Sequence, residues 1–75
     1  MQRLGTVSRT AQNLLVVRCD DADHPGIGTE AVDESLSTVG RVVDVFGPVD
    51  RPYVAVAPES SVRPASVVGQ RLYAR

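Results

Sequence analysis

The sequence is poor in the residues that build disulfides, metal sites and nucleophilic centres. It has one cysteine, Cys19, and one histidine, His24, among 75 residues. A single cysteine forms no internal disulfide, and these two residues together give no structural zinc set. No run approaches the roughly 18 apolar residues of a membrane span, and residues 1–5 lack the apolar stretch of a secretory signal. We therefore expect a cytoplasmic protein that needs no metal and no cofactor.

Lysine and tryptophan are absent, and the charges of the two signs nearly cancel. All eight basic residues are arginine, six of the nine acidic residues are aspartate, and the net charge is −1. This balance argues against strong binding of nucleic acid by the chain alone, because such proteins usually carry a basic patch or stripe. Arginine without lysine, together with abundant aspartate, fits a salt-rich halophilic cytoplasm and fits GC-rich coding bias equally well.

What is present favours strands. Valine occurs fourteen times, and six glycines and five prolines divide the chain into short segments. Such a composition is typical of short strands joined by turns. The predicted strands are residues 3–9, 13–18, 30–33, 40–46, 53–57 and 68–73, with one helical turn at 64–67. Six such strands predict an all-β fold, a single small β-barrel domain over residues 1–75, because closure removes exposed strand edges.

Two of these strands, 40–46 and 53–57, form a hairpin around the loop 47–52. Pairing about this loop places Phe46 opposite Tyr53, and side chains then alternate between two faces. The predicted inner face is a layer of valines: Val43, Val45, Val54 and Val56. The predicted outer face carries Val42, Asp44, Phe46, Tyr53 and Ala55.

The aromatic pair on the outer face has two interpretations. Opposed aromatics stabilise a hairpin by roughly 0.2–1 kcal/mol, which requires no partner. Exposed aromatics beside small residues also suit a docking surface. The loop favours docking, because it is longer than most hairpin loops and is stiffened by Pro48 and Pro52.

The same hairpin carries a family resemblance. Residues 40–49, GRVVDVFGPV, and then residues 51–56, RPYVAV, closely resemble the signature of the Gar family. These proteins are the small β-barrel subunits of H/ACA ribonucleoproteins, which guide pseudouridine formation in RNA. Residues 3–7 and 68–73 resemble the ends of the family, so the resemblance covers nearly the whole chain. It implies a six-stranded barrel of the type found in reductase and translation-factor domains.

The resemblance also implies a function. Such a subunit is not an enzyme: it docks on the catalytic domain of the pseudouridine synthase subunit, contacts guide RNA mostly indirectly, and is a monomer outside the complex. It promotes substrate RNA loading and turnover in pseudouridylation and rRNA processing. Because it has no flanking Gly/Arg-rich tails, the chain resembles the archaeal members of the family. The residues carried over to partner binding are Val42, Phe46, Gly47, Pro48, Val49, Pro52, Tyr53, Ala55 and Tyr73. For Tyr73, packing as a plug of the barrel and joining the docking surface remain equal alternatives.

Other interpretations draw on the remaining chemistry. A free-standing barrel that binds single-stranded RNA would stack bases on Phe46, Tyr53 and Tyr73, and would need arginines around them. A metal site at Asp20, Asp21, Asp23 and His24 lacks the spacing of a calcium loop, so we expect a solvated loop there. Cys19 follows a buried strand and has no well-placed base, so we expect it to fill the core.

Overall fold

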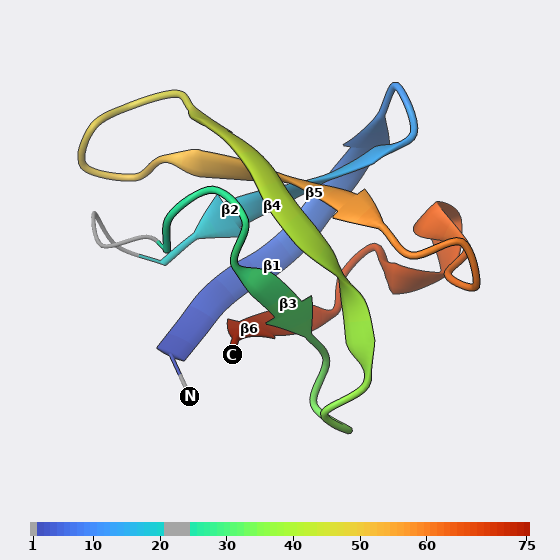
Figure 1. Cartoon of the computed structure of the whole chain (residues 1–75). Helices are drawn as coiled ribbons and strands as arrows, with labels where there is room; N and C mark the ends of the chain where they lie inside the picture. Colours follow the sequence, from blue (N-terminus) through green and yellow to red (C-terminus); the bar gives the residue numbers. More distant parts are fainter. Residues whose placement is uncertain (1, 21–24) are drawn as a thin grey trace.

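Six antiparallel strands close into a barrel in the order β1-β2-β5-β4-β3-β6, in a computed structural model that describes residues 2–20 and 25–75 (Figure 1). The elements are β1 (Gln2–Ala11), β2 (Leu14–Cys19), β3 (Glu30–Val32), β4 (Thr38–Phe46), β5 (Tyr53–Pro58), the 3-10 helix η1 (Pro64–Val67) and β6 (Arg71–Ala74). The predicted all-β six-stranded barrel is confirmed. Among the described residues, no helix is long and apolar enough to cross a bilayer.

The strand boundaries follow from turn chemistry. The β1–β2 connection is two residues, Gln12 and Asn13, both at positive φ (52° and 64°). Two residues at positive φ match the twist of a tight hairpin, so β1 runs further toward the turn than the sequence predicts. The last strand begins later than predicted, because residues 67–70 form a turn in which the Gln70 N–H donates to the Val67 carbonyl at 3.0 Å.

The core is a cluster of small β-branched and leucine side chains. The run in β2 is covered on both sides of the sheet, as its continuous apolar sequence predicts: Leu15 and Val17 are fully buried inward, and Val16 is 4% exposed on the other face. Cys19 packs in the same cluster, as expected. Each fully buried valine or leucine contributes roughly 1.5–3 kcal/mol relative to exposure. Val67 of η1 adds to this cluster from one end of the barrel.

A β-bulge in β4 changes the predicted faces of that strand. The register is Phe46–Tyr53, Val45–Val54 and Asp44–Ala55 as predicted, but the next pair is Val42–Val56. Two residues, Val43 and Asp44, therefore stand opposite Ala55, and the alternation slips by one. Val42 lies in the core at 1% exposure and Val43 is 41% exposed. The prediction of Val43 inside and Val42 outside is wrong because regular alternation takes no account of the extra residue.

An ion pair joins the end of the chain to the short strand β3. Nη2 of Arg75 lies 2.9 Å from Oε2 of Glu30, and the Thr38 hydroxyl donates to the same carboxylate. The hydrogen bond from Arg75, followed by that from Thr38, lowers the pKa of Glu30 to about 2. The strands β3 and β6 share only two register pairs, so their backbone ladder is short. The ion pair adds a side-chain contact where this ladder ends.

Candidate functional site

The outer face of four neighbouring strands holds two rows of side chains. One row runs across β1, β2, β5 and β4 through the register partners Thr6, Arg18, Tyr53 and Phe46. Alternation places all four on the outside, because the residues next to them along the strands are largely in the core.

The second row has small side chains at its centre. Val16 pairs with Ala55, and each is 4% exposed although neither belongs to the core cluster. Bulges flank them on both sides, since the register slips between Val7 and Arg9 on β1 and between Val42 and Asp44 on β4. Val16 and Ala55 therefore lie covered on the outer face, between the two bulges.

An apolar zone occupies the β4–β5 end of this face; we define it as Val43, Phe46, Val49 and Tyr53. The rings of Phe46 and Tyr53 stack with centroids 5.6 Å apart and planes at 24°. Phe46 is 40% exposed and Val49 is 91% exposed on a loop that extends beyond the body of the barrel (Figure 1). Exposed apolar side chains that share one end of a sheet with stacked aromatics are typical of an interaction surface.

Two features fix the shape of the loop in this zone. Gly47 has φ of 90°, and a Cβ at this position would lie 2.9 Å from Cδ2 of Tyr53. Glycine therefore supplies the backbone conformation and lets the aromatic ring lie against the chain. At the other end of the loop, Pro52 is buried and its carbonyl accepts the Cys19 N–H at 3.1 Å. The loop is thus tied to β2 while Val49 stays exposed.

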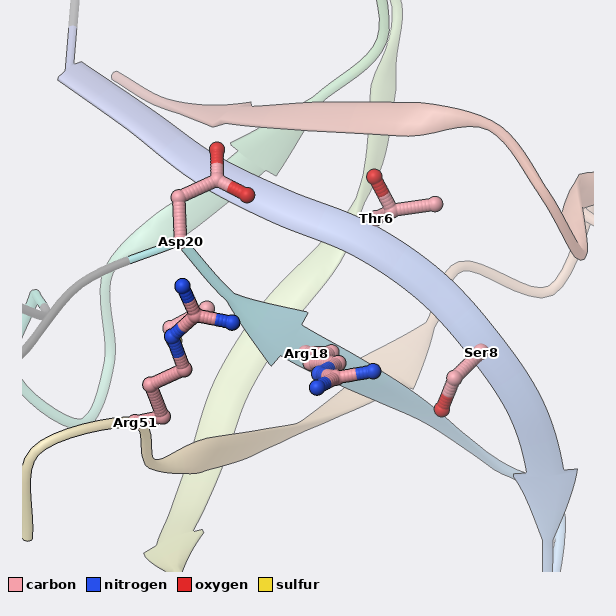
Figure 2. A pocket seen from close by; sticks show the side chains of 6 residues that line it. Thr6, Ser8, Arg18, Asp20 and Arg51 are labelled. Atoms are coloured by element: carbon pink, nitrogen blue, oxygen red, sulfur yellow. The ribbon is translucent and has the colours of Figure 1, made fainter.

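A basic hollow lies next to the apolar zone on the same face, since Arg18 pairs with Tyr53 and Arg51 belongs to the loop that carries Val49. Its volume is about 440 Å³, and it is lined by Thr6, Ser8, Arg18, Cys19, Asp20 and Arg51. In the view of Figure 2, the guanidinium group of Arg18 lies between the guanidinium group of Arg51 and the hydroxyl of Ser8. The Asp20 carboxylate is 3.4 Å from Nη1 of Arg3.

Comparison with known proteins identifies the family. The Gar1/Naf1 RNA binding region matches residues 1–75. The chain belongs to this family. A protein of Methanothermobacter thermautotrophicus that carries no functional name is 26% identical over 76 residues, with 97% of this chain and 82% of that protein covered. A solved structure described as the Gar1 domain of Naf1 superposes with a TM-score of 0.72 at 14% identity, covering 99% of this chain and 81% of that one.

Membership in the Gar1/Naf1 family confirms the predicted resemblance and associates the chain with RNA and with ribonucleoproteins of the H/ACA type. The family is one of non-catalytic ribonucleoprotein proteins. The similarity to the Naf1 domain confirms the barrel fold.

The structure brings together only part of the predicted partner-binding set. Phe46, Gly47, Pro48, Val49 and Tyr53 share the hairpin end, all exposed except the half-buried Tyr53. Three other members of the predicted set are covered: Val42, Pro52 and Ala55. The bulge turns Val42 into the core, Pro52 is buried at the loop anchor, and Ala55 lies covered beside Val16. These three therefore offer almost no contact area to a partner.

Tyr73 lies apart from the other aromatics. It is half-buried on β6, where its register partners are Arg3 of β1 and Val32 of β3. In the ring of six strands, β6 is three positions from β5, so Tyr73 and Tyr53 lie on opposite sides of the barrel. The geometry therefore separates Tyr73 from the apolar zone, and a stacking surface made of all three aromatics does not form.

Two residues of this face are missed by the sequence analysis, Val43 and Arg18. Val43 is exposed by the bulge, for which a run of valines gives no signal. Arg18 lies beside Tyr53 through the β2–β5 pairing, which joins segments more than thirty residues apart. The alternation of Arg18 with Val17 already indicates an outward side chain, but not which strand lies next to it.

The polar candidates of the sequence analysis have other partners. The Asp44 carboxylate accepts the Val45 N–H at 2.8 Å, and Arg41 donates to the Gly28 carbonyl at 3.2 Å. Asp21, Asp23 and His24 lie outside the described residues. Within residues 2–20 and 25–75, no three acidic, histidine or cysteine side chains gather as metal ligands.

Proposed function

We propose that this chain is a non-catalytic subunit that docks on the catalytic domain of a pseudouridine synthase in an H/ACA ribonucleoprotein. In that role it promotes loading of substrate RNA and turnover in pseudouridylation during rRNA processing. The observation that carries the proposal is the apolar zone, where a stacked aromatic pair and a 91% exposed valine share one end of the barrel. Family membership supports the ribonucleoprotein context.

The apolar zone suits a protein partner because its shape is set before binding. The rings of Phe46 and Tyr53 are already stacked, and the loop is held by Gly47 at one end and Pro52 at the other. Little conformational entropy is lost when such a surface is covered, and buried aromatics dominate the binding energy of protein interfaces. A barrel of this size buries little apolar area in its own core, so a partner that covers the apolar zone adds to the buried area.

The test is a calorimetric titration of the chain with the pseudouridine synthase subunit, in parallel with guide RNA alone. We expect binding to the synthase and much weaker binding to RNA. Val49→Asp, which places a charge in the apolar zone, is expected to weaken synthase binding at least tenfold. Failure of the wild-type chain to bind the synthase would overturn the proposal.

Leu36→Asp is the matched control. Leu36 is 51% exposed in the β3–β4 connection, at the opposite end of β4 from the apolar zone. The variant makes the same change from an apolar to an acidic side chain. Its affinity for the synthase should equal that of the wild-type chain. An equal loss in both variants would place docking elsewhere on the barrel.

A further inference from the structure

The basic hollow offers guanidinium and hydroxyl groups that have no role in the proposed docking through the apolar zone. It is lined by residues of β1, of β2 and of the β4–β5 loop, so segments far apart in sequence converge there. Figure 2 shows Arg18 extending from β2 and Arg51 from the loop on the same side of the sheet.

The two arginines of the hollow are available to a ligand. Among the described residues, neither Arg18 nor Arg51 makes a hydrogen bond or an ion pair, and both are exposed. By contrast, Arg75 is bound by Glu30 and Arg41 by a backbone carbonyl. Among the described residues that line the hollow, Asp20 is the one carboxylate, and it is paired with Arg3. The described lining of the hollow therefore carries a net positive charge, although the whole chain has a net charge of −1.

The remaining lining groups are hydroxyls. Ser8 Oγ donates to the Val16 carbonyl at 3.2 Å. Thr6 makes no side-chain hydrogen bond within the described part of the chain. One free hydroxyl donor beside two guanidinium forks suits a ligand rich in acceptor oxygens.

A phosphodiester fits this donor set better than a protein carboxylate. Guanidinium groups bind phosphate oxygens in two-pronged hydrogen bonds, and each phosphate offers acceptors to several donors at once. The volume of about 440 Å³ is also large for a single carboxylate. Arg18 is the register partner of Tyr53, so a strand entering the hollow would run along the margin of the apolar zone.

We propose that the basic hollow is an RNA contact of this subunit, in which Arg18 and Arg51 bind phosphodiester groups of a single-stranded segment. The hollow lies on the same outer face as the apolar zone but is built from different side chains, so one barrel holds a protein partner and an RNA strand side by side. This contact is independent of the synthase-docking proposal, and the two can be separated by variants.

The experiment is a fluorescence-anisotropy titration of the full chain against a labelled oligouridine 12-mer at several salt concentrations. The double variant Arg18→Gln/Arg51→Gln should bind at least tenfold more weakly at low salt. Each phosphate contact to single-stranded RNA contributes about 0.7 to the slope of log K against log salt, so the slope should fall by roughly 1.4. Amide NMR spectra of the wild-type chain with the same oligomer should show the largest shifts at residues 18 and 51.

The charge-matched control is Arg63→Gln/Arg71→Gln, which removes two exposed arginines outside the hollow. It should retain the affinity and the salt slope of the wild type. Equal losses in both double variants would mean that RNA senses only the net charge, and would overturn the proposal, as would the absence of shifts at residues 18 and 51.

Two further arms identify the ligand and the surface. An oligoglutamate of equal charge should bind at least tenfold more weakly than the oligouridine; equal binding would make the hollow a carboxylate site and overturn the RNA assignment. Val49→Ser, which adds no charge beside Arg51, should keep RNA binding while it weakens synthase binding. Arg18→Gln/Arg51→Gln should fold as the wild type does by circular dichroism.

Discussion

The rings of Phe46 and Tyr53 stack at 5.6 Å at the last register pair of the β4–β5 hairpin. The two residues close the strand ladder and also form the centre of the apolar zone. Aromatic pairs of this geometry contribute about 0.5–1.5 kcal/mol beyond the area they bury. We therefore expect a variant at either position to lower stability a little. If the proposed docking is right, the same variant lowers the affinity for the synthase much more.

Tyr53→Ala should leave the barrel folded and weaken its binding to the synthase by about 2 kcal/mol or more, as for a buried interface aromatic. Calorimetry measures the affinity, and thermal unfolding checks the fold. Tyr53→Phe is the control, because it keeps the ring that stacks on Phe46 and should retain most of the affinity. An unchanged dissociation constant in folded Tyr53→Ala would remove Tyr53 from the docking surface.

The bulge in β4 makes two adjacent valines unequal. Val42→Ala should reduce the free energy of unfolding by about 1.5–3 kcal/mol, because it opens a cavity in a packed core. Val43→Ala removes the same atoms from a 41% exposed site and should stay within about 0.5 kcal/mol of the wild type. Urea denaturation compares the two, and equal losses would contradict the observed position of the bulge.

The same bulge marks a limit of what the sequence predicts. Local patterns predict the strands, the β4–β5 loop and the pairing from Phe46 to Asp44, because alternation and turn residues act over short distances. The register beyond Asp44 depends on how the strand bends to close the barrel, which is a property of all six strands together. One slipped residue exchanged the faces of Val42 and Val43.

The composition of the functional face has a similar limit. The sequence predicts Phe46 and Tyr53 as neighbours because a single hairpin loop joins their strands. It does not predict that Arg18 lies beside Tyr53, because the β2–β5 pairing is a long-range contact that only closure of the barrel enforces. The basic hollow is therefore invisible in the sequence, and the near-neutral net charge argues against it.

The ion pair between Glu30 and Arg75 predicts a pH dependence of stability. The hydrogen bonds from Arg75 and Thr38 hold the pKa of Glu30 at about 2, below its ordinary value of 4.5. A carboxyl with a depressed pKa in the folded state stabilises fully above its unfolded pKa and loses that contribution as pH falls through the folded value. Stability should therefore decline between about pH 4.5 and pH 2.

Glu30→Gln removes this dependence and separates it from general acid effects. The variant should be less stable than the wild type at pH 7, and the difference should shrink as pH approaches 2. Thermal unfolding across this range measures it. Glu59→Gln is the matched control at an exposed glutamate without a side-chain partner among the described residues. A constant difference between Glu30→Gln and the wild type would show that the carboxyl does not act through its charge.

Gly47 and Gly28 separate backbone strain from contact with the aromatic ring. Both have positive φ, at 90° and 94°, so alanine at either position should cost about 1–3 kcal/mol of stability. A Cβ at Gly28 meets nothing within 4 Å, whereas one at Gly47 would lie 2.9 Å from the ring of Tyr53. Gly47→Ala should therefore destabilise more than Gly28→Ala, and it alone should displace the ring and weaken synthase binding.

Denaturant unfolding and calorimetry on both variants measure these effects. Equal losses of stability, with equal affinities, would mean that the ring of Tyr53 does not depend on the glycine beneath it.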